Sequence, residues 1–176
     1  MRRKLGFDNN DFIVAFVGRF VKVKGIDKLC NALNLIDNEN IKAIFIGEGN
    51  IKPNYKNIVF EGSLQHDDIA DYLSASDIFV LPTTAEGCCN AIIEALVCGL
   101  PVISSKESFN DDILDASCSI RINSINVLEI KAAIDRLYND RQFREQLSKG
   151  ALDTAKKLEI GNRAKGIIKF IEDTTN

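Results

Sequence analysis

Two glutamates, Glu86 and Glu94, stand eight positions apart where a polar loop gives way to an apolar helix pattern. Eight residues of helix span about 12 Å. Carboxyl pairs that act together on one glycosidic bond lie only about 5 to 9.5 Å apart. The spacing therefore favours contacts from the two glutamates to distant parts of one ligand over acid and nucleophile roles at a single bond.

The carboxylate of Glu94 needs a partner, because its neighbours in the expected helix are apolar. Burying an unpaired charge is costly, so Glu94 either accepts hydrogen bonds from a ligand or forms a structural salt bridge. Asn90 stands at the start of this helix and is a favourable N-cap. The free N–H groups of the first helical turn offer a place for an anion.

Basic residues gather in the segment 18–25, where an expected strand leads into an expected helix. Arg19 can hold a phosphate through two parallel hydrogen bonds, and Lys24 adds a point charge near the helix start. The flanking Gly18 and Gly25 let the backbone approach an anion closely. The segment lacks the residue order of a Walker loop. Its alternative role is a solvated basic turn.

Alternating apolar patterns predict the elements that position these residues. Short apolar runs ended by glycine, proline or polar residues predict buried strands, and apolar residues at helical spacing predict helices. Strands are expected at 12–17, 41–46, 58–60, 78–81, 101–105 and 118–122. Helices are expected at 25–36, 67–76, 90–98, 124–138, 140–158 and about 160–172.

This alternation predicts an α/β fold: a single doubly wound Rossmann-like domain over residues 1–176, with a six-stranded parallel sheet and C-terminal helices. Ligands of such sheets bind at the carboxyl ends of the strands. The segments expected there are 18–25, 47–50, 61–66, 82–90 and 104–112. Both charged loops therefore belong to one edge of the sheet.

Composition and charge exclude several classes of function. The net charge is −3, whereas a general nucleic-acid binder needs a basic face, so no nucleic-acid partner is expected. The start of the chain turns polar before any apolar run develops, and the apolar runs are too short to span a membrane. We therefore expect a cytoplasmic protein without a signal peptide or transmembrane segment.

The five cysteines show no CxxC pair and no zinc-like spacing with the single histidine, His66. We expect free, buried or partly buried thiols and no metal site. The cysteines are Cys30, Cys88, Cys89, Cys98 and Cys118.

The run 86–103, EGCCNAIIEALVCGLPVI, resembles the E-x7-E segment of retaining GT-B glycosyltransferases of family 4, in the group 1 glycosyl transferases. Other motifs resemble that family in the same order along the chain, from about residue 3 to about residue 172. They are Val17-Gly18-Arg19, Lys24-Gly25-Ile26, Gly47-Glu48-Gly49, Phe60-Glu61-Gly62 and the stretch 76–82.

The resemblance implies a role for each matching position in binding a nucleoside-diphosphate sugar, such as a UDP- or GDP-sugar. Arg19 and Lys24 would hold the diphosphate, Glu86 the sugar and Glu94 the ribose hydroxyls. Arg19, Lys24 and Glu86 would also carry the catalytic roles. Main-chain groups of Gly87, Cys88, Cys89 and Asn90 would contact the distal phosphate or the sugar. Main-chain groups of Gly62 and Leu64 would border the base. The resemblance implies no cofactor and no metal.

The resemblance further implies that the chain is the second, donor-binding half of a GT-B enzyme. The full enzyme would transfer a sugar to an acceptor hydroxyl with retention, in bacterial polysaccharide or glycolipid synthesis. Its N-terminal domain, which would bind the sugar or glycolipid acceptor, is expected to be absent from this chain, so the isolated domain is expected to be inactive. Peripheral association of the full-length enzyme with the inner face of a membrane is compatible with this reading.

Two departures from the family pattern bear on specificity. Cys88 and Cys89 replace the usual phenylalanine and second glycine, and the segment 108–112 replaces a Gly-Gly-x-Pro-Glu loop. Two alternatives stay open, a stand-alone nucleotide-binding or interaction module and a sugar-nucleotide 2-epimerase. The epimerase would need a histidine at the sugar, and we do not expect His66 there. A dehydrogenase is disfavoured because no G-x-G-x-x-G follows the first strand.

Overall fold

The computed structural model describes residues 1–86, 89–123 and 126–158. Within these residues six strands form one sheet in the order β3-β2-β1-β4-β5-β6, and every neighbouring pair is parallel. The strands are β1 (Phe12–Val17), β2 (Ile41–Ile46), β3 (Ile58–Gly62), β4 (Ile78–Leu81), β5 (Val102–Ser105) and β6 (Ser119–Ile122). The expected doubly wound sheet is confirmed.

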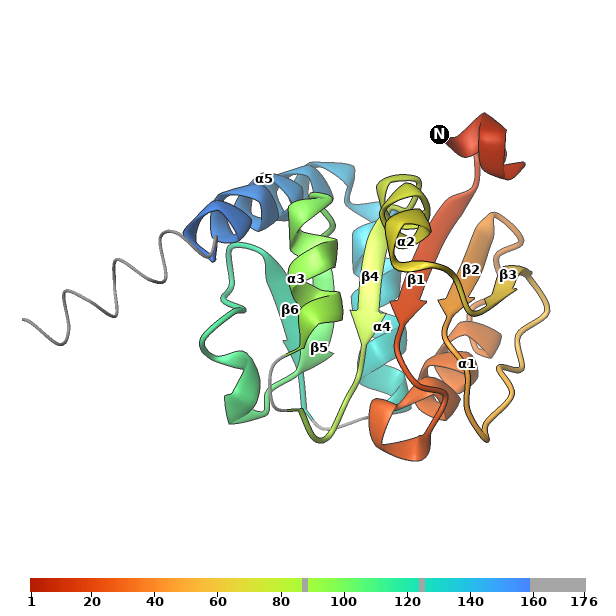
Figure 1. Cartoon of the computed structure of the whole chain (residues 1–176), viewed down its shortest axis with the longest axis horizontal. Helices are drawn as coiled ribbons and strands as arrows, with labels where there is room; N and C mark the ends of the chain where they lie inside the picture. The colour runs from red at the N-terminus through yellow and green to blue at the C-terminus, as the bar shows by residue number, and fades with distance from the viewer. Residues whose placement is uncertain (87–88, 124–125, 159–176) are drawn as a thin grey trace, which may run out of the picture.

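Helices cover both faces of the sheet. They are α1 (Ile26–Asn34), α2 (His66–Ser74), α3 (Asn90–Val97), α4 (Val127–Asn139) and α5 (Arg141–Lys157). Figure 1 shows α2 and α3 in front of the sheet and α1 and α4 behind it, while α5 packs on both α3 and α4. Short 3-10 turns occur at Arg2–Leu5, Lys22–Lys24 and Ser108–Asn110. The helix expected near 160–172 lies outside the described residues.

The central strands are apolar along their whole length because both of their faces are covered. All six residues of β1 and all four of β4 are buried. Phe16, Phe45 and Phe79, one from each of β1, β2 and β4, are completely buried. The core therefore lies on both sides of the strands that lead into the charged loops.

The edge strand β3 is longer than its apolar run predicts. It continues through Glu61 to Gly62, which pairs with Ile46 of β2. β3 is hydrogen-bonded along one edge only, and its side chains alternate between half-buried and exposed. Because such a strand includes polar residues, its apolar run ends before the strand does.

The strand order reverses between β1 and β4. From β1 the chain winds outward to β2 and β3, then returns to β4 on the other side of β1 and continues to β5 and β6. The loops after β1 and β4 consequently leave the sheet toward opposite faces, and a crevice opens between them. This crevice receives the segment 18–25 and, from the loop after β4, residues 82–86 and 89–90.

Candidate functional site

The loop after β1 approaches the end of β4 so closely that one position must be glycine. Gly25 has a φ of 70°, and a Cβ there would lie 2.3 Å from the carbonyl oxygen of Pro82. The backbone amide of Thr84 and the hydroxyl of Thr83 both donate to the carbonyl of Val23, at 2.9 and 3.2 Å. These contacts fix the position of the loop after β1 relative to the loop after β4.

A second layer of hydrogen bonds supports the loop after β4 from below. The buried hydroxyl of Ser105 donates to the carbonyl of Thr83 at 2.6 Å. The side-chain amide of Asn110 donates to the carbonyl of Ser105 at 3.0 Å and to the hydroxyl of Ser104 at 3.2 Å. The segment 108–112, which replaces a glycine-rich loop of the family, thus contributes a buried structural residue at Asn110.

Lys24 and Glu86 meet across the crevice. The Lys24 ammonium donates to the Glu86 carboxylate, and their side chains are only 14% and 10% exposed. From the resemblance these residues were expected to serve different parts of a ligand, the diphosphate and the sugar. In the structure they form one ion pair.

Arg19 differs from Lys24 in having no such partner in the part of the chain that the structure describes. It is exposed on the loop after β1, and no hydrogen bond or ion pair of its side chain is found among the described residues. Its guanidinium is therefore available to an anion entering the crevice.

The start of α3 corrects the assignment of Asn90 as N-cap. The N-cap is Cys89, and Asn90 is the first helical residue, exposed and without a capping hydrogen bond. Cys89 has the non-helical torsions that an N-cap requires (φ −89°, ψ 88°), and its carbonyl accepts from the amides of Ile92 and Ile93. The helix therefore begins one residue earlier than a polar cap predicts.

The Cys89 side chain is buried at the start of α3. Burial raises the pKa of this thiol to about 12, and the negative charge of Glu86 acts in the same direction. The thiol is consequently protonated at neutral pH. The other described cysteines, Cys30, Cys98 and Cys118, are also free and buried or half-buried, as expected.

Two hollows meet at Arg19. One, of about 250 Å³, is lined by Arg19, Lys24, Glu86, Cys89 and Asn90 together with apolar residues at the strand ends. The other, of about 270 Å³, lies between the ends of β1, β2 and β3, and its lining includes Arg19 and Leu64. Gly62 lies beside the second hollow, in a groove with Gly47 and Ser63. Gly87 and Cys88, also expected at the site, lie outside the described residues.

Glu94 lies farther along α3 and lines a third hollow, of about 170 Å³, between α2 and α3. Its carboxylate forms no ion pair or hydrogen bond that could be found within residues 1–86, 89–123 and 126–158, although it is half-buried among Ile69, Leu73 and Val97. The salt bridge considered for Glu94 is thus not found there. Ile69 borders both this hollow and the one that contains Leu64.

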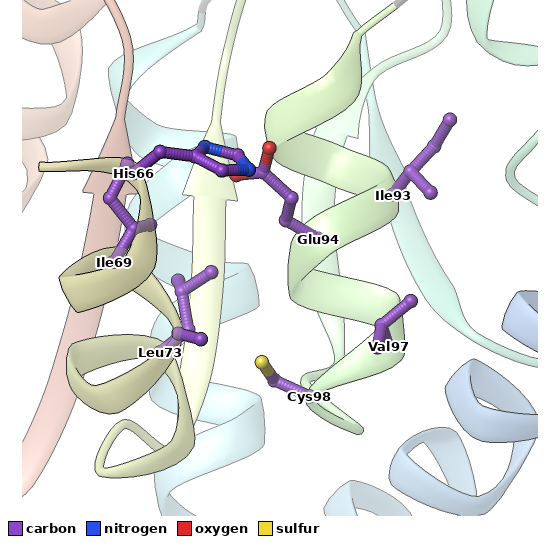
Figure 2. A pocket seen from close by; sticks show the side chains of 8 residues that line it. His66, Ile69, Leu73, Ile93, Glu94, Val97 and Cys98 are labelled. Atoms are coloured by element: carbon purple, nitrogen blue, oxygen red, sulfur yellow. The ribbon is translucent and has the colours of Figure 1, made fainter.

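His66 lies at this edge, in the segment 61–66 that was expected there, although no site role was predicted for it. Figure 2 shows its imidazole pointing from the start of α2 toward the Glu94 carboxylate. His66 is absent from the lining of the hollow that holds Glu86, where an epimerase histidine was considered. Its position in the segment 61–66, at the carboxyl end of β3, was the available signal.

The described residues contain no group of three or more histidine, cysteine, aspartate or glutamate side chains that could hold a metal ion. Within the same residues, no helix is long and apolar enough to cross a membrane. The described residues thus form a series of hollows with an exposed arginine, a helix N-terminus, a paired carboxylate and a carboxylate for which they provide no partner.

Comparison with known proteins gives one matching family profile, glycosyl transferases group 1, over residues 1–154. The glycosyltransferase TuaC of Bacillus subtilis, named for teichuronic acid biosynthesis, is 27% identical over 170 residues, which cover 95% of this chain and 43% of TuaC. Uncharacterized glycosyltransferase MJ1178 of Methanocaldococcus jannaschii is 26% identical over 171 residues, 92% of this chain and 48% of MJ1178.

Solved structures share the fold. HepE of Anabaena in complex with UDP superimposes with a TM-score of 0.83 at 21% identity, over 98% of this chain and 51% of HepE. Sucrose-phosphate synthase from Thermosynechococcus elongatus gives a TM-score of 0.82 at 22% identity, over 99% of this chain and 49% of the synthase. The chain thus spans less than half the length of these two curated relatives and about half of these solved chains.

Proposed function

The chain belongs to the glycosyl transferases group 1 family, and from that premise we propose that it binds the nucleoside-diphosphate sugar of a retaining, family 4 glycosyltransferase. The crevice between the loops after β1 and β4 is the donor site. The full enzyme transfers the sugar to an acceptor hydroxyl in polysaccharide or glycolipid synthesis, in the cytoplasm or at the inner face of a membrane.

The observation that carries this proposal is the half-buried carboxylate of Glu94, which is unpaired among the described residues and lies at a distance from the charged crevice. Such a group is costly unless a ligand donates to it. Ribose hydroxyls are suitable donors, and the two phosphates then extend toward Arg19 and the start of α3. Glu86 faces the sugar, and Leu64 borders the base.

The diphosphate leaves with added negative charge, which the site must stabilise. Arg19, Lys24 and the free amides at the start of α3 offer positive charge and partial positive charge at that place. They supply this without a metal ion, and the departing phosphate itself assists a same-face substitution. Retention rests on the family resemblance.

The names of similar proteins support UDP- or GDP-sugars as donors. The HepE structures contain UDP or UDP-glucose. A GDP-mannose-dependent mannosyltransferase of Corynebacterium glutamicum is 24% identical over 156 residues. We expect the acceptor to bind to another domain of the full enzyme, so that this chain alone binds donor and transfers little or no sugar.

A thermal-shift and calorimetry panel tests the proposal. The chain is titrated with UDP, GDP, UDP-glucose, UDP-GlcNAc and GDP-mannose, with NAD as a control dinucleotide. One pair of diphosphate and diphosphate sugar should stabilise the chain by about 2.7 kcal/mol at a hundredfold excess over Kd. An Arg19→Met variant should bind that pair more weakly. A folded chain that none of these nucleotides stabilises is evidence against the proposal.

A further inference from the structure

The crevice contains two cations in different electrostatic states. Arg19 is exposed and has no partner among the described residues, whereas Lys24 is partly buried and paired with Glu86. The charge of Lys24 is therefore already balanced before any ligand arrives. An entering phosphate meets a neutral ion pair at this point and not an isolated ammonium.

Glu86 is held by Lys24, which donates to its carboxylate from the loop after β1. Both side chains line one hollow together with Cys89 at the start of α3. Because the Glu86 side chain is 10% exposed, water screens its charge only weakly. The part of its field that Lys24 does not cancel therefore acts on any group brought next to the carboxylate in the hollow.

A phosphate near Lys24 must also come near Glu86, so its effect depends on the charge of the ligand. A free nucleoside diphosphate ends in a phosphate whose second ionisation has a pKa of about 6. That ionisation is lost when the same phosphate carries a sugar. The free diphosphate thus brings about one more negative charge toward Glu86 at neutral pH, and it brings no sugar hydroxyl to donate to the carboxylate.

We propose that Glu86, as the counter-ion of Lys24, is a specificity-determining residue that favours a sugar-bearing nucleoside diphosphate over the free one. The carboxylate repels the terminal phosphate of the free diphosphate and accepts hydrogen bonds from the sugar of the donor. After transfer, the same repulsion promotes release of the product. This inference rests on the proposed function, since it takes the hollow as the place of the diphosphate and sugar.

The test compares two dissociation constants in one protein. Calorimetry measures Kd for UDP and UDP-glucose, or for GDP and GDP-mannose if that pair binds, with the wild-type chain and with Glu86→Gln. Glutamine keeps the shape and removes the charge. We expect Glu86→Gln to bind the free diphosphate about three- to tenfold more tightly, and the diphosphate sugar no more tightly than the wild type does.

Glu145→Gln is the matched control. Glu145 also pairs with a cation, Arg141, but on the surface of α5 and outside the crevice. This variant should leave both dissociation constants unchanged. A ratio of the two constants that is the same in Glu86→Gln as in the wild type would overturn the inference. A wild-type chain that binds neither nucleotide would instead count against the proposed function.

Removing the other partner gives a second, independent arm. In Lys24→Met the Glu86 charge loses its counter-ion, so binding of the free diphosphate should weaken more than binding of the diphosphate sugar. In the double variant Lys24→Met/Glu86→Gln this extra loss should disappear, which a double-mutant cycle measures. Equal weakening of both ligands in Lys24→Met would contradict the proposed role of Glu86, even if Glu86→Gln does not fold.

Discussion

At the scale of single residues, the two glutamates eight positions apart have different surroundings. Glu86 is enclosed by a lysine and a thiol, whereas Glu94 is half-buried beside apolar groups and faces His66. The first is electrostatically satisfied without a ligand. The second still lacks a hydrogen-bond donor among the described residues, so its energetic contribution depends more strongly on what binds.

Replacing Glu94 with alanine should weaken binding of the nucleoside diphosphate. Loss of charged hydrogen bonds to ribose costs on the order of 1.5–3 kcal/mol, and calorimetry of the folded variant measures it. Folding should be little affected, because the carboxylate has no partner to leave unpaired among the described residues. Unchanged affinity in Glu94→Ala would remove the ribose role from this residue.

The Cys89 thiol should make stability fall in alkaline solution. Its pKa is raised from 9.0 to about 12 in the folded chain, so the folded state retains a proton that the unfolded state releases. The contribution is complete below pH 9 and is lost as pH rises from there toward the folded pKa.

Denaturant unfolding between pH 8 and 10.5 tests this expectation. Burial also raises the pKa of Cys30, Cys98 and Tyr55, so the wild-type free energy of unfolding should decline for several reasons. In Cys89→Ala the decline should be smaller, by on the order of 1–2 kcal/mol at the upper end of this range. Parallel curves for the two proteins would show that the thiol ionises equally in both states.

At the scale of elements, the site depends on how two loops contact each other. The loop after β1 and the loop after β4 belong to strands that are neighbours in the sheet but far apart in the chain. Val23 accepts from Thr83 and Thr84, and Gly25 packs against Pro82. The Lys24–Glu86 pair forms because these main-chain contacts already bring the loops together.

Gly25→Ala should separate the loops and damage both stability and binding. The new Cβ would lie 2.3 Å from a backbone oxygen, at a φ of 70°. Strained backbone alone costs on the order of 1 kcal/mol, and the clash adds to it. Gly6→Ala is the control, since Gly6 has a φ of 75° but nothing within 4 Å of an added Cβ.

Thermal unfolding and nucleotide calorimetry of the two variants separate strain from clash. Both should lose stability through the backbone torsion, and Gly25→Ala should lose more. Only Gly25→Ala should also weaken nucleotide binding. Gly6 is the C-cap of the N-terminal 3-10 turn, which lies away from the crevice. Equal effects on stability and binding would mean that the contact with Pro82 does not position the loops.

At the scale of the whole molecule, the fold presents its charged loops at a single edge. The six parallel strands all end at the edge where the two hollows that meet at Arg19 lie, and Figure 1 shows the arrowheads pointing to one side. The third hollow, with Glu94, lies between α2 and α3 on one face of the sheet. A ligand that spans these hollows is long and carries chemically different ends. That geometry suits a nucleoside-diphosphate sugar better than a compact substrate.

Much of this could be predicted from the sequence, because apolar periodicity depends on neighbours a few residues away. The six strands, the parallel sheet and the placing of Arg19, Lys24, Glu86 and Leu64 at its carboxyl edge all follow from local patterns. The N-cap of α3 does not follow from local patterns. Asn90 is a better capping residue than Cys89, but the backbone torsions, which the loop sets, make Cys89 the N-cap.

By itself, then, the sequence determined the order of elements, the edge of the sheet to which the polar loops belong and the charged residues gathered there. Only the tertiary structure decided which of those residues touch. Lys24 and Glu86 are 62 positions apart, and His66 and Glu94 come from different helices. No local sequence pattern therefore predicts that the members of either pair lie close together. They meet because β1 lies beside β4 and α2 beside α3, a result of packing the whole sheet.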